Sequence, residues 1–355
     1  MKIAVDIRPL SHTITGIGRY TLSVLSRMMQ GSAHQWFLYS DAPLADEIAL
    51  PSPYVFRAPK VKPPLSSSLL AQTLFPCWAM RDRVELFWSP RHHLPLFMPR
   101  KIKCIVTIHD VVWVRHPETM THGGRLLEQL LMRPSIRVAD GVICVSDFTR
   151  RELKAIFSVA ESKILVTPLA ATAPPTNGTA ALPRQLQGAS YVLFVGTLEP
   201  RKNLQGLIQA FAELPARYSN YRLVIAGQDG WLQQPLKNML DKYGIADRCL
   251  LMGYVDEALL HCLYQQAAAL AMPSLYEGYG LPALEAMQYG IPVVVGSESE
   301  IAGLNSSLVY VCQNTGAAAI LSALTRAIEA GKGRPWAMNS WQDTAQKTLE
   351  LIESI

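Results

Sequence analysis

The chain has 355 residues, of which 49% are hydrophobic and 17% are charged, and its formal net charge is +5. This composition excludes fibrous and intrinsically disordered proteins, and the length fits two domains better than one. No apolar run approaches the roughly 18 residues that a membrane-spanning helix needs, and the first residues are too charged for a signal peptide. We therefore expect a cytoplasmic protein.

Charge is unevenly distributed along the chain. Residues 1–185 hold 22 Lys and Arg against 13 Asp and Glu, a net charge of +9, and the remainder is net acidic. A basic half favours an anionic partner such as phospholipid head groups, a lipid diphosphate or an anionic glycan, although a solvated surface without a partner stays open. No nucleic-acid-binding signature occurs, so we expect no nucleic-acid partner. The six cysteines form no Cys-x-x-Cys pair, which argues against a zinc site or a disulfide framework.

The first half alternates short apolar runs with helical periodicity. An apolar run at 2–7, a glycine-containing segment and a periodic stretch at 20–29 predict a strand, a loop and a helix. Such alternation predicts a parallel sheet that is covered on both faces. Further strands are expected at 36–39, 86–88, 102–108, 141–145 and 164–167, and further helices around 125–137 and 149–157.

Residues 171–190 interrupt this alternation with a run of Pro, Gly, Thr and Ala that is typical of an extended linker. Two α/β halves joined by a linker predict an interdomain cleft, where ligands bind at the carboxyl ends of strands. We expect an N-terminal domain at 1–175, against which an amphipathic helix at 336–355 packs, and a C-terminal domain at 190–335. Strands of the second series are expected at 191–195, 222–226, 249–252, 268–272, 292–295 and 308–311.

The strongest functional pattern is Pro-Ser-Leu-Tyr-Glu-Gly-Tyr-Gly-Leu-Pro-Ala-Leu-Glu-Ala-Met at 273–287, which begins where a predicted strand ends. Gly278 and Gly280 let the backbone approach a ligand, and a proline suits the first turn of a helix whose N-terminus can bind phosphate. We expect Glu285 in that first turn, where it can accept two hydrogen bonds from a sugar diol, and Glu277 in the preceding loop. The alternative role for Glu285 is to complement the helix dipole.

A second pattern, Phe-Val-Gly-Thr-Leu-Glu-Pro-Arg-Lys-Asn-Leu at 194–204, joins a strand that ends at Gly196 to the basic pair Arg201 and Lys202. We expect this pair to open a helix that runs through Ala210. Two cations beside a helix N-terminus are suited to holding a diphosphate, whereas a surface Arg-Lys pair elsewhere is usually solvated.

His109 and Asp110 directly follow the predicted strand at 102–108, so we expect them to face a cleft, with Asp110 able to orient His109. A hydrogen-bonded structural histidine is the alternative. His92 and His93 are more consistent with structural or acceptor-lining roles than with catalysis.

Gly16, Gly18 and Arg19 lie in a segment without the third glycine of the dinucleotide-binding fingerprint, because Thr21 stands at that place. The second strand also lacks a clear acidic residue at its end. We therefore disfavour NAD binding and expect a loop that faces phosphate or an acceptor.

With these residues, the chain resembles the retaining glycosyltransferases of family 4, and the resemblance covers nearly its whole length. Glu277 and Glu285 look like the Glu-x7-Glu motif of that family, and residues 196–203 are similar to its diphosphate segment. Residues 145–149 and Trp341 look like further family features. The resemblance implies the GT-B fold, an α/β architecture of two Rossmann-like doubly wound domains with an interdomain cleft.

The resemblance also implies a division of labour, with the acceptor in the N-terminal domain and the nucleotide sugar in the C-terminal domain. Glu285 would bind the ribose hydroxyls and Glu277 the hydroxyls of the donor sugar. Arg201 and Lys202 would bind the diphosphate, and His109 would lie near the transferred sugar. No Asp-x-Asp occurs, so we expect no cofactor and no metal. The catalytic candidates are His109, Glu277, Arg201 and Lys202, and the donor-binding candidates are Glu285, Gly196, Gly278, Tyr279, Gly280 and Leu281.

Residues 6–9 and 15–20 look most like bacterial mannosyltransferases of surface-polysaccharide assembly. This likeness implies transfer of mannose or a related hexose from a GDP-sugar to a glycan or lipid-linked acceptor in O-antigen or exopolysaccharide synthesis. Residues 167–170 lack the Asn-Gly pair of many members, and the loop at 296–300 is unusually acidic, which leaves the donor open. The alternatives are a UDP-sugar-dependent transferase of the same fold, a nucleotide-sugar epimerase and a non-catalytic nucleotide-sugar-binding subunit.

The basic first half also suggests peripheral attachment to the inner face of the plasma membrane, where each basic side chain contributes roughly 1 kcal/mol. The candidate side chains are Lys60, Lys62, Arg81, Arg83, Arg100, Lys101 and Lys103.

Overall fold

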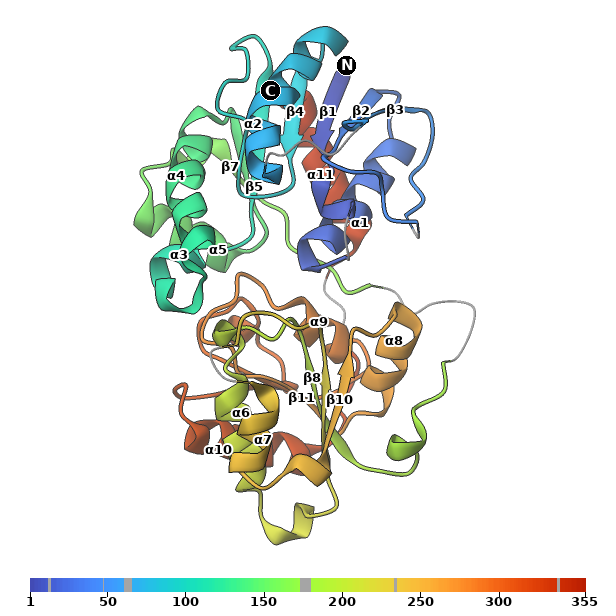
Figure 1. Cartoon of the computed structure of the whole chain (residues 1–355), viewed down its shortest axis with the longest axis vertical. Helices are drawn as coiled ribbons and strands as arrows, with labels where there is room; N and C mark the ends of the chain where they lie inside the picture. Colours follow the sequence, from blue (N-terminus) through green and yellow to red (C-terminus); the bar gives the residue numbers. More distant parts are fainter. Residues whose placement is uncertain (12–13, 47, 61–65, 173–179, 233–234, 337–338) are drawn as a thin grey trace. The chain divides into compact units, whose positions relative to one another are not determined.

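The computed structural model describes the chain apart from residues 12–13, 47, 61–65, 173–179, 233–234 and 337–338. The described residues divide into two compact units, each built on its own parallel β-sheet (Figure 1). The first unit contains Met1–Trp113, His122–Leu169 and Asn339–Ile355, and the second contains Val114–Thr121 and Ala170–Met338. The α/β organisation predicted from the alternating sequence pattern is confirmed.

The first unit has a seven-stranded sheet in the order β3-β2-β1-β4-β5-β6-β7. Its central strands are almost fully buried because a parallel sheet is covered on both faces. The strands are β1 (Lys2–Asp6), β2 (Gln35–Tyr39), β3 (Tyr54–Arg57), β4 (Leu86–Ser89), β5 (Lys103–Ile108), β6 (Gly141–Cys144) and β7 (Ile164–Val166). The helices are α1 (Gly16–Gln30), α2 (Ser67–Asp82), α4 (His122–Val138), α5 (Asp147–Ile156) and α11 (Trp341–Ser354), and the short α3 (Val112–Arg115) leads into the second unit.

Helix α11 belongs to the first unit, and Figure 1 shows it beside α1 although the two helices lie at opposite ends of the sequence. The Trp341 ring meets the Tyr20 ring edge-on with centroids 6.3 Å apart. The Thr344 hydroxyl donates to the Pro168 carbonyl over 2.7 Å. The side chain of Ser340 caps the start of the helix, which ends the connecting segment at a defined residue.

The second unit has a six-stranded sheet in the order β10-β9-β8-β11-β12-β13. One face packs against α6 and α10 through a continuous apolar core that includes Leu207, Phe211 and Leu324. The strands are β8 (Tyr191–Val195), β9 (Arg222–Ala226), β10 (Cys249–Gly253), β11 (Ala269–Met272), β12 (Val293–Val295) and β13 (Val309–Val311). The helices are α6 (Leu204–Ala212), α7 (Leu236–Lys242), α8 (Glu257–Gln266), α9 (Leu281–Met287) and α10 (Ala317–Ala330).

Strand order reverses once in each sheet, between β1 and β4 in the first unit and between β8 and β11 in the second. The two strands of such a pair are parallel, but the chain leaves their carboxyl ends toward opposite faces of the sheet. The loops that follow them therefore separate and create a crevice for ligands. In the first unit these loops follow Asp6 and Ser89, and in the second they follow Val195 and Met272. In the second unit, the two polar motifs singled out in the sequence therefore begin where the topology favours a site, whereas His109 follows β5, the neighbour of β4.

Three segments differ from the sequence-based prediction. The pattern predicts neither β3, a short edge strand, nor α2, whose apolar residues do not gather on one face and which contains Pro76. Residues 16–19 form the first turn of α1 and not a loop. Gly18 is required there for packing, because a Cβ atom at this position would lie 2.8 Å from the Pro9 carbonyl oxygen. The predicted loop at Gly16, Gly18 and Arg19 is therefore wrong, and a role of these residues toward phosphate or the acceptor stays a prediction.

The predicted linker and the predicted basic set for membrane attachment lie only partly within the described residues. Of the predicted linker at 171–190, residues 173–179 lie outside them, and so does Lys62 of the basic set. The other six basic side chains of that set are exposed, so membrane attachment stays a prediction. No helix in the described ranges is long and apolar enough to cross a lipid bilayer.

We expect Gly227→Ala to destabilise the second unit by at least about 2 kcal/mol, because a Cβ atom would lie 1.9 Å from the Gly196 carbonyl oxygen. A backbone atom cannot rotate away as a side chain can, so β8 and β9 would have to separate at their ends. Thermal unfolding of the purified protein measures the effect. Gly303→Ala is the matched control, because nothing lies within 4 Å of its added Cβ. Equal melting temperatures for the two variants would contradict the packing argument.

Candidate functional site

The two motif-bearing segments of the second unit meet at the strand-order reversal between β8 and β11. The backbone N–H of Leu275 donates to the Arg201 carbonyl over 2.8 Å, and the Asn203 amide group donates to the Pro273 carbonyl over 3.3 Å. These bonds tie the segment after β8 directly to the segment after β11. The basic pair and the Glu277 loop, which are more than 70 residues apart in sequence, thus form one site.

Glu277 is the centre of this site. It is buried, and its two carboxylate oxygens accept separately from Arg201 Nη1 over 2.9 Å and from Lys202 Nζ over 2.6 Å. Arg201 Nη2 also donates to Glu199 Oε1 over 2.6 Å. Burial raises the pKa of Glu277, but the charges of Arg201 and Lys202 outweigh burial and lower that pKa to about 2. The carboxylate is therefore ionised and holds both cations in place.

The local fold of the basic pair differs from the prediction. Arg201 and Lys202 do not open the helix α6, because they lie in a 3-10 turn, Pro200–Lys202. Asn203, in a left-handed conformation with φ 53°, separates this turn from the first residue of α6. The turn brings both side chains back toward Glu277, which a continuous helix would not do for adjacent residues.

Glycines at two sites of this region are required by backbone conformation. Gly280 precedes α9 with φ 110°, and a Cβ there would lie 3.0 Å from Met272 Cε and 3.1 Å from Ile301 Cγ1. Gly196 follows β8 with φ 150°, and its Cβ would contact the Lys202 side chain at 3.4 Å. Both glycines let the backbone turn closely around the site. Donor contacts at Gly196, Gly278, Tyr279, Gly280 and Leu281 stay predictions.

Glu285 is the fifth residue of α9, so it lies just past the first turn in which it was predicted. Only 1% of its surface is exposed. Its Oε2 accepts from the Tyr264 hydroxyl over 2.9 Å, and its Oε1 accepts from the Thr172 hydroxyl over 3.4 Å. The carboxylate is thus already held by two hydroxyl donors, which are the donor type that ribose would supply. Binding of ribose by Glu285 stays a prediction.

His109 lies in the first unit, directly after β5, as predicted. Its Nε2–H donates to the Pro90 carbonyl over 2.8 Å, and its ring packs edge-on against Tyr20 with centroids 5.0 Å apart. Asp110 does not orient it, because Asp110 accepts from the backbone N–H of Val112. Burial and the nearby charge of His92 lower the pKa of His109 to about 3. His109 is therefore a neutral imidazole whose tautomer is fixed by a backbone carbonyl.

The acidic loop at 296–300 lies against the Glu277 segment, since the Glu277 backbone N–H donates to the Glu298 carbonyl over 2.9 Å. The Glu298 carboxylate lies 3.5 Å from Nε2 of His116. The His116 ring also lies 6.1 Å from the ring of Tyr276. The sequence marks this loop as unusual but gives no signal that His116, from the segment after β5, reaches it.

Sequence reasoning missed four partners of the predicted residues: Glu199, Thr172, Tyr264 and the Pro90 carbonyl. Glu199 stands two residues before Arg201, and a carboxylate so close to a basic pair could have been considered as its partner. Tyr264 lies in α8, and Pro90 follows β4, so only the fold brings them to Glu285 and His109.

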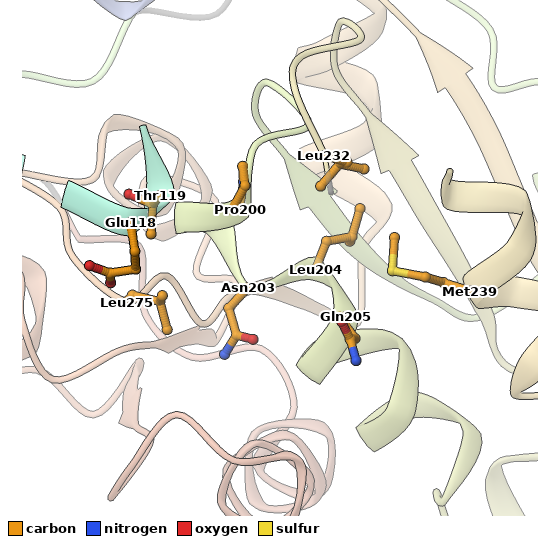
Figure 2. A pocket seen from close by; sticks show the side chains of 9 residues that line it. All are labelled: Glu118, Thr119, Pro200, Asn203, Leu204, Gln205, Leu232, Met239 and Leu275. Atoms are coloured by element: carbon orange, nitrogen blue, oxygen red, sulfur yellow. The ribbon is translucent and has the colours of Figure 1, made fainter. Parts of the chain in front are cut away.

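A cavity of about 240 Å³ lies in the second unit beside the turn that carries the basic pair, and Figure 2 shows the side chains that line it. Its walls come from α6, α7 and the segment at 118–119, which the Trp231 indole holds through a 2.8 Å hydrogen bond to the Thr119 carbonyl. None of the predicted site residues lines it. The lining residues are Glu118, Thr119, Pro200, Asn203, Leu204, Gln205, Leu232, Met239 and Leu275.

No group of three or more His, Cys, Asp or Glu side chains in the described part of the chain has a geometry that could hold a metal ion. The positive charges of the second-unit site are those of Arg201 and Lys202. Independence from a metal stays a prediction about the reaction.

Comparison with known proteins agrees with this arrangement. The family model described as Glycosyltransferase Family 4 matches residues 14–170, and the model described as Glycosyl transferases group 1 matches residues 184–346. The O-antigen chain mannosyltransferase B of Escherichia coli is 30% identical, and the alignment covers 99% of this chain and all of that protein.

Solved structures share the fold at low sequence identity. A sucrose-phosphate synthase from Thermosynechococcus elongatus superposes with a TM-score of 0.75 at 18% identity, covering 100% of this chain and 98% of that chain. WaaG, a glycosyltransferase involved in lipopolysaccharide biosynthesis, superposes with a TM-score of 0.71 at 16% identity, covering 98% and 95%. The predicted GT-B fold with two Rossmann-like doubly wound domains is therefore confirmed. With both units matched by glycosyltransferase models and a full-length relative at 30% identity, the chain belongs to glycosyltransferase family 4.

Proposed function

We propose that this glycosyltransferase transfers mannose or a closely related hexose, with retention of configuration, from a GDP-sugar to a glycan or lipid-linked acceptor of bacterial surface polysaccharide. The observation that carries the proposal is the buried Glu277 with Arg201 and Lys202 at the strand-order reversal of the second unit. The name of the full-length relative, an O-antigen chain mannosyltransferase, supports the sugar and the class of product.

In this proposal Arg201 and Lys202 bind the diphosphate of the donor. Both cations already point at one carboxylate, so their N–H groups are oriented before the nucleotide sugar binds. Phosphate oxygens can take up the remaining donor capacity of the guanidinium and ammonium groups, while Glu277 and Glu199 keep them from swinging away. Such preorganised charge is worth most where charge develops in the transition state, here on the departing β-phosphate oxygen.

The chemical step needs no side-chain nucleophile. The bond from the anomeric carbon to the β-phosphate oxygen breaks, and the acceptor oxygen bonds to that carbon on the same face. The proton of the acceptor hydroxyl passes to the departing phosphate oxygen. Glu277 is a poor nucleophile for an alternative double displacement, because both of its oxygens accept hydrogen bonds from cations.

His109 serves the transferred sugar as a neutral hydrogen-bond acceptor. Its Nε2–H is committed to Pro90, so Nδ1 carries the lone pair that can accept a sugar hydroxyl proton. Because its pKa is lowered to about 3, His109 places no positive charge next to a sugar that develops oxocarbenium character.

We expect GDP to raise the melting temperature of the protein by several degrees and UDP and ADP to raise it less. A ligand that binds only the folded state adds about 2.7 kcal/mol at 100 times its Kd. Guanosine is the control, because it lacks the diphosphate that Arg201 and Lys202 would bind. A shift selective for UDP would overturn the donor and leave the family, and no shift with any nucleotide would argue against the proposal as a whole.

We expect the product to keep the anomeric configuration of the donor, with no covalent glycosyl-enzyme along the way. Proton NMR of the initial product gives the configuration, and intact-protein mass spectrometry of rapidly quenched turnover mixtures searches for the adduct. Inversion would contradict the proposed stereochemistry. A sugar covalently trapped on a side chain would contradict the same-face mechanism.

We expect Arg201→Ala to lower kcat by about 100- to 1,000-fold, the usual effect of removing one donor to a transition-state oxyanion. The assay is run in EDTA, because the proposal assigns charge stabilisation to these side chains and not to a metal. Arg217→Ala is the matched control, since Arg217 is an exposed arginine of the same unit that pairs with Glu329. A change in KM alone, or loss of wild-type activity in EDTA, would refute the assigned role.

A further inference from the structure

A pinned turn follows β4 at the strand-order reversal of the first unit. The Ser89 hydroxyl donates to the His93 carbonyl over 2.7 Å, and the His109 ring donates to the Pro90 carbonyl over 2.8 Å. The turn is therefore fixed at both ends by hydrogen bonds from outside its own backbone. It places the His92 ring next to His109, the residue that we assign to the transferred sugar, with ring centroids 5.6 Å apart, and the charge of Arg91 acts on the pKa values of both histidines.

One ring nitrogen of His92 has a partner, and the other has none. Its Nδ1 lies 3.5 Å from the Glu128 carboxylate, which also lies 3.0 Å from Nε2 of His93. Burial lowers the pKa of His92, but the Glu128 charge outweighs burial and raises it. Within the described residues, His92 Nε2 is buried and has no hydrogen-bond partner. A buried nitrogen without a partner costs free energy, which a ligand atom would recover.

Arg91 is also without a bonded counter-ion. Asp6 is already used by Arg8 through two short contacts, Nη2 to Oδ2 at 2.5 Å and Nε to Oδ1 at 2.9 Å. Glu128 is used by the two histidines. Arg91 is partly buried; its backbone carbonyl accepts from the Ser89 hydroxyl over 3.1 Å, but within the described residues its guanidinium group makes no hydrogen bond or ion pair. A guanidinium group in this setting retains its full set of donors for a ligand.

We propose that Arg91 and His92 form an anion-binding subsite of the first unit, which recognises a phosphate group attached to the acceptor saccharide. The inference rests on the proposed function for the identity of the sugar, but the subsite itself rests on the Arg91 guanidinium, the unpartnered Nε2 of His92 and the pinned turn.

Phosphate fits this subsite better than a sugar hydroxyl does. The planar fork of arginine matches two oxygens of one phosphate, and Nε2 of His92 adds a third donor when the imidazole is protonated. A single hydroxyl would satisfy only one of these donors. The net charge of +9 in residues 1–185 further favours an anionic acceptor over a neutral one.

The test compares binding of mannose 1-phosphate and methyl α-mannoside by isothermal titration calorimetry, using the full chain. Saturating nucleoside diphosphate is present so that Arg201 and Lys202 do not contribute. We expect mannose 1-phosphate to bind at least tenfold more tightly than the neutral glycoside. Arg91→Gln should weaken mannose 1-phosphate at least tenfold and leave the neutral glycoside unchanged, and Arg91→Lys should recover part of the loss because it restores the charge without the fork.

Arg100→Gln is the matched control, because Arg100 is an exposed arginine just before the amino end of β5, whereas Arg91 follows the carboxyl end of the parallel strand β4. Circular dichroism and melting temperature check that each variant is folded. Equal binding of both probes, or unchanged binding by folded Arg91→Gln, would overturn the subsite. Inorganic phosphate that binds as tightly as mannose 1-phosphate would assign a free anion and contradict the acceptor. If no nucleoside diphosphate binds, the proposed function fails, and the titration without nucleotide still decides the role of Arg91.

Discussion

The second-unit site depends on the ion pairs of the buried Glu277 carboxylate with Arg201 and Lys202. An ionised carboxylate that loses its partners in the protein interior destabilises the fold by about 3–5 kcal/mol. Glu277 avoids this cost because Arg201 and Lys202 each donate to a different oxygen. The segments after β8 and β11 are thereby joined by ion pairs as well as by backbone hydrogen bonds. If either segment moved, a charged group would lose its partner or become exposed to solvent.

This pairing also explains how the diphosphate site that we propose can exist without a large net charge. Arg201 and Lys202 are balanced by Glu277 and Glu199, so the cluster is close to neutral. Long-range electrostatic attraction of a diphosphate is therefore weak, and its recognition would depend on N–H groups of Arg201 and Lys202 that are already oriented. The two carboxylates keep long, flexible cationic side chains in one geometry, which removes conformational entropy that donor binding would otherwise have to overcome. Neutrality and preorganisation are thus two consequences of the same contacts.

The sequence predicts the α/β architecture well, because buried parallel strands appear in it as continuous apolar runs, such as those of β1, β5 and β11. It also predicts which loops carry candidate site residues, because the polar motifs follow those runs. It fails where the outcome depends on neighbours distant in sequence. Gly18 is a glycine for packing against Pro9, which no local pattern distinguishes from a phosphate loop. The tautomer of His109 depends on a carbonyl that follows another strand, and the adjacent Asp110 is not involved.

The two strand-order reversals present opposite electrostatic arrangements. In the second unit the cations of the site are matched by carboxylates that hold them. In the first unit the carboxylates Asp6 and Glu128 are taken by Arg8 and by the two histidines, which leaves Arg91 unmatched. A phosphate at the first site would supply a missing charge, whereas a phosphate at the second would join a charge balance that already exists. Affinity at the first site should therefore respond to the charge of the ligand, and affinity at the second should respond chiefly to its geometry.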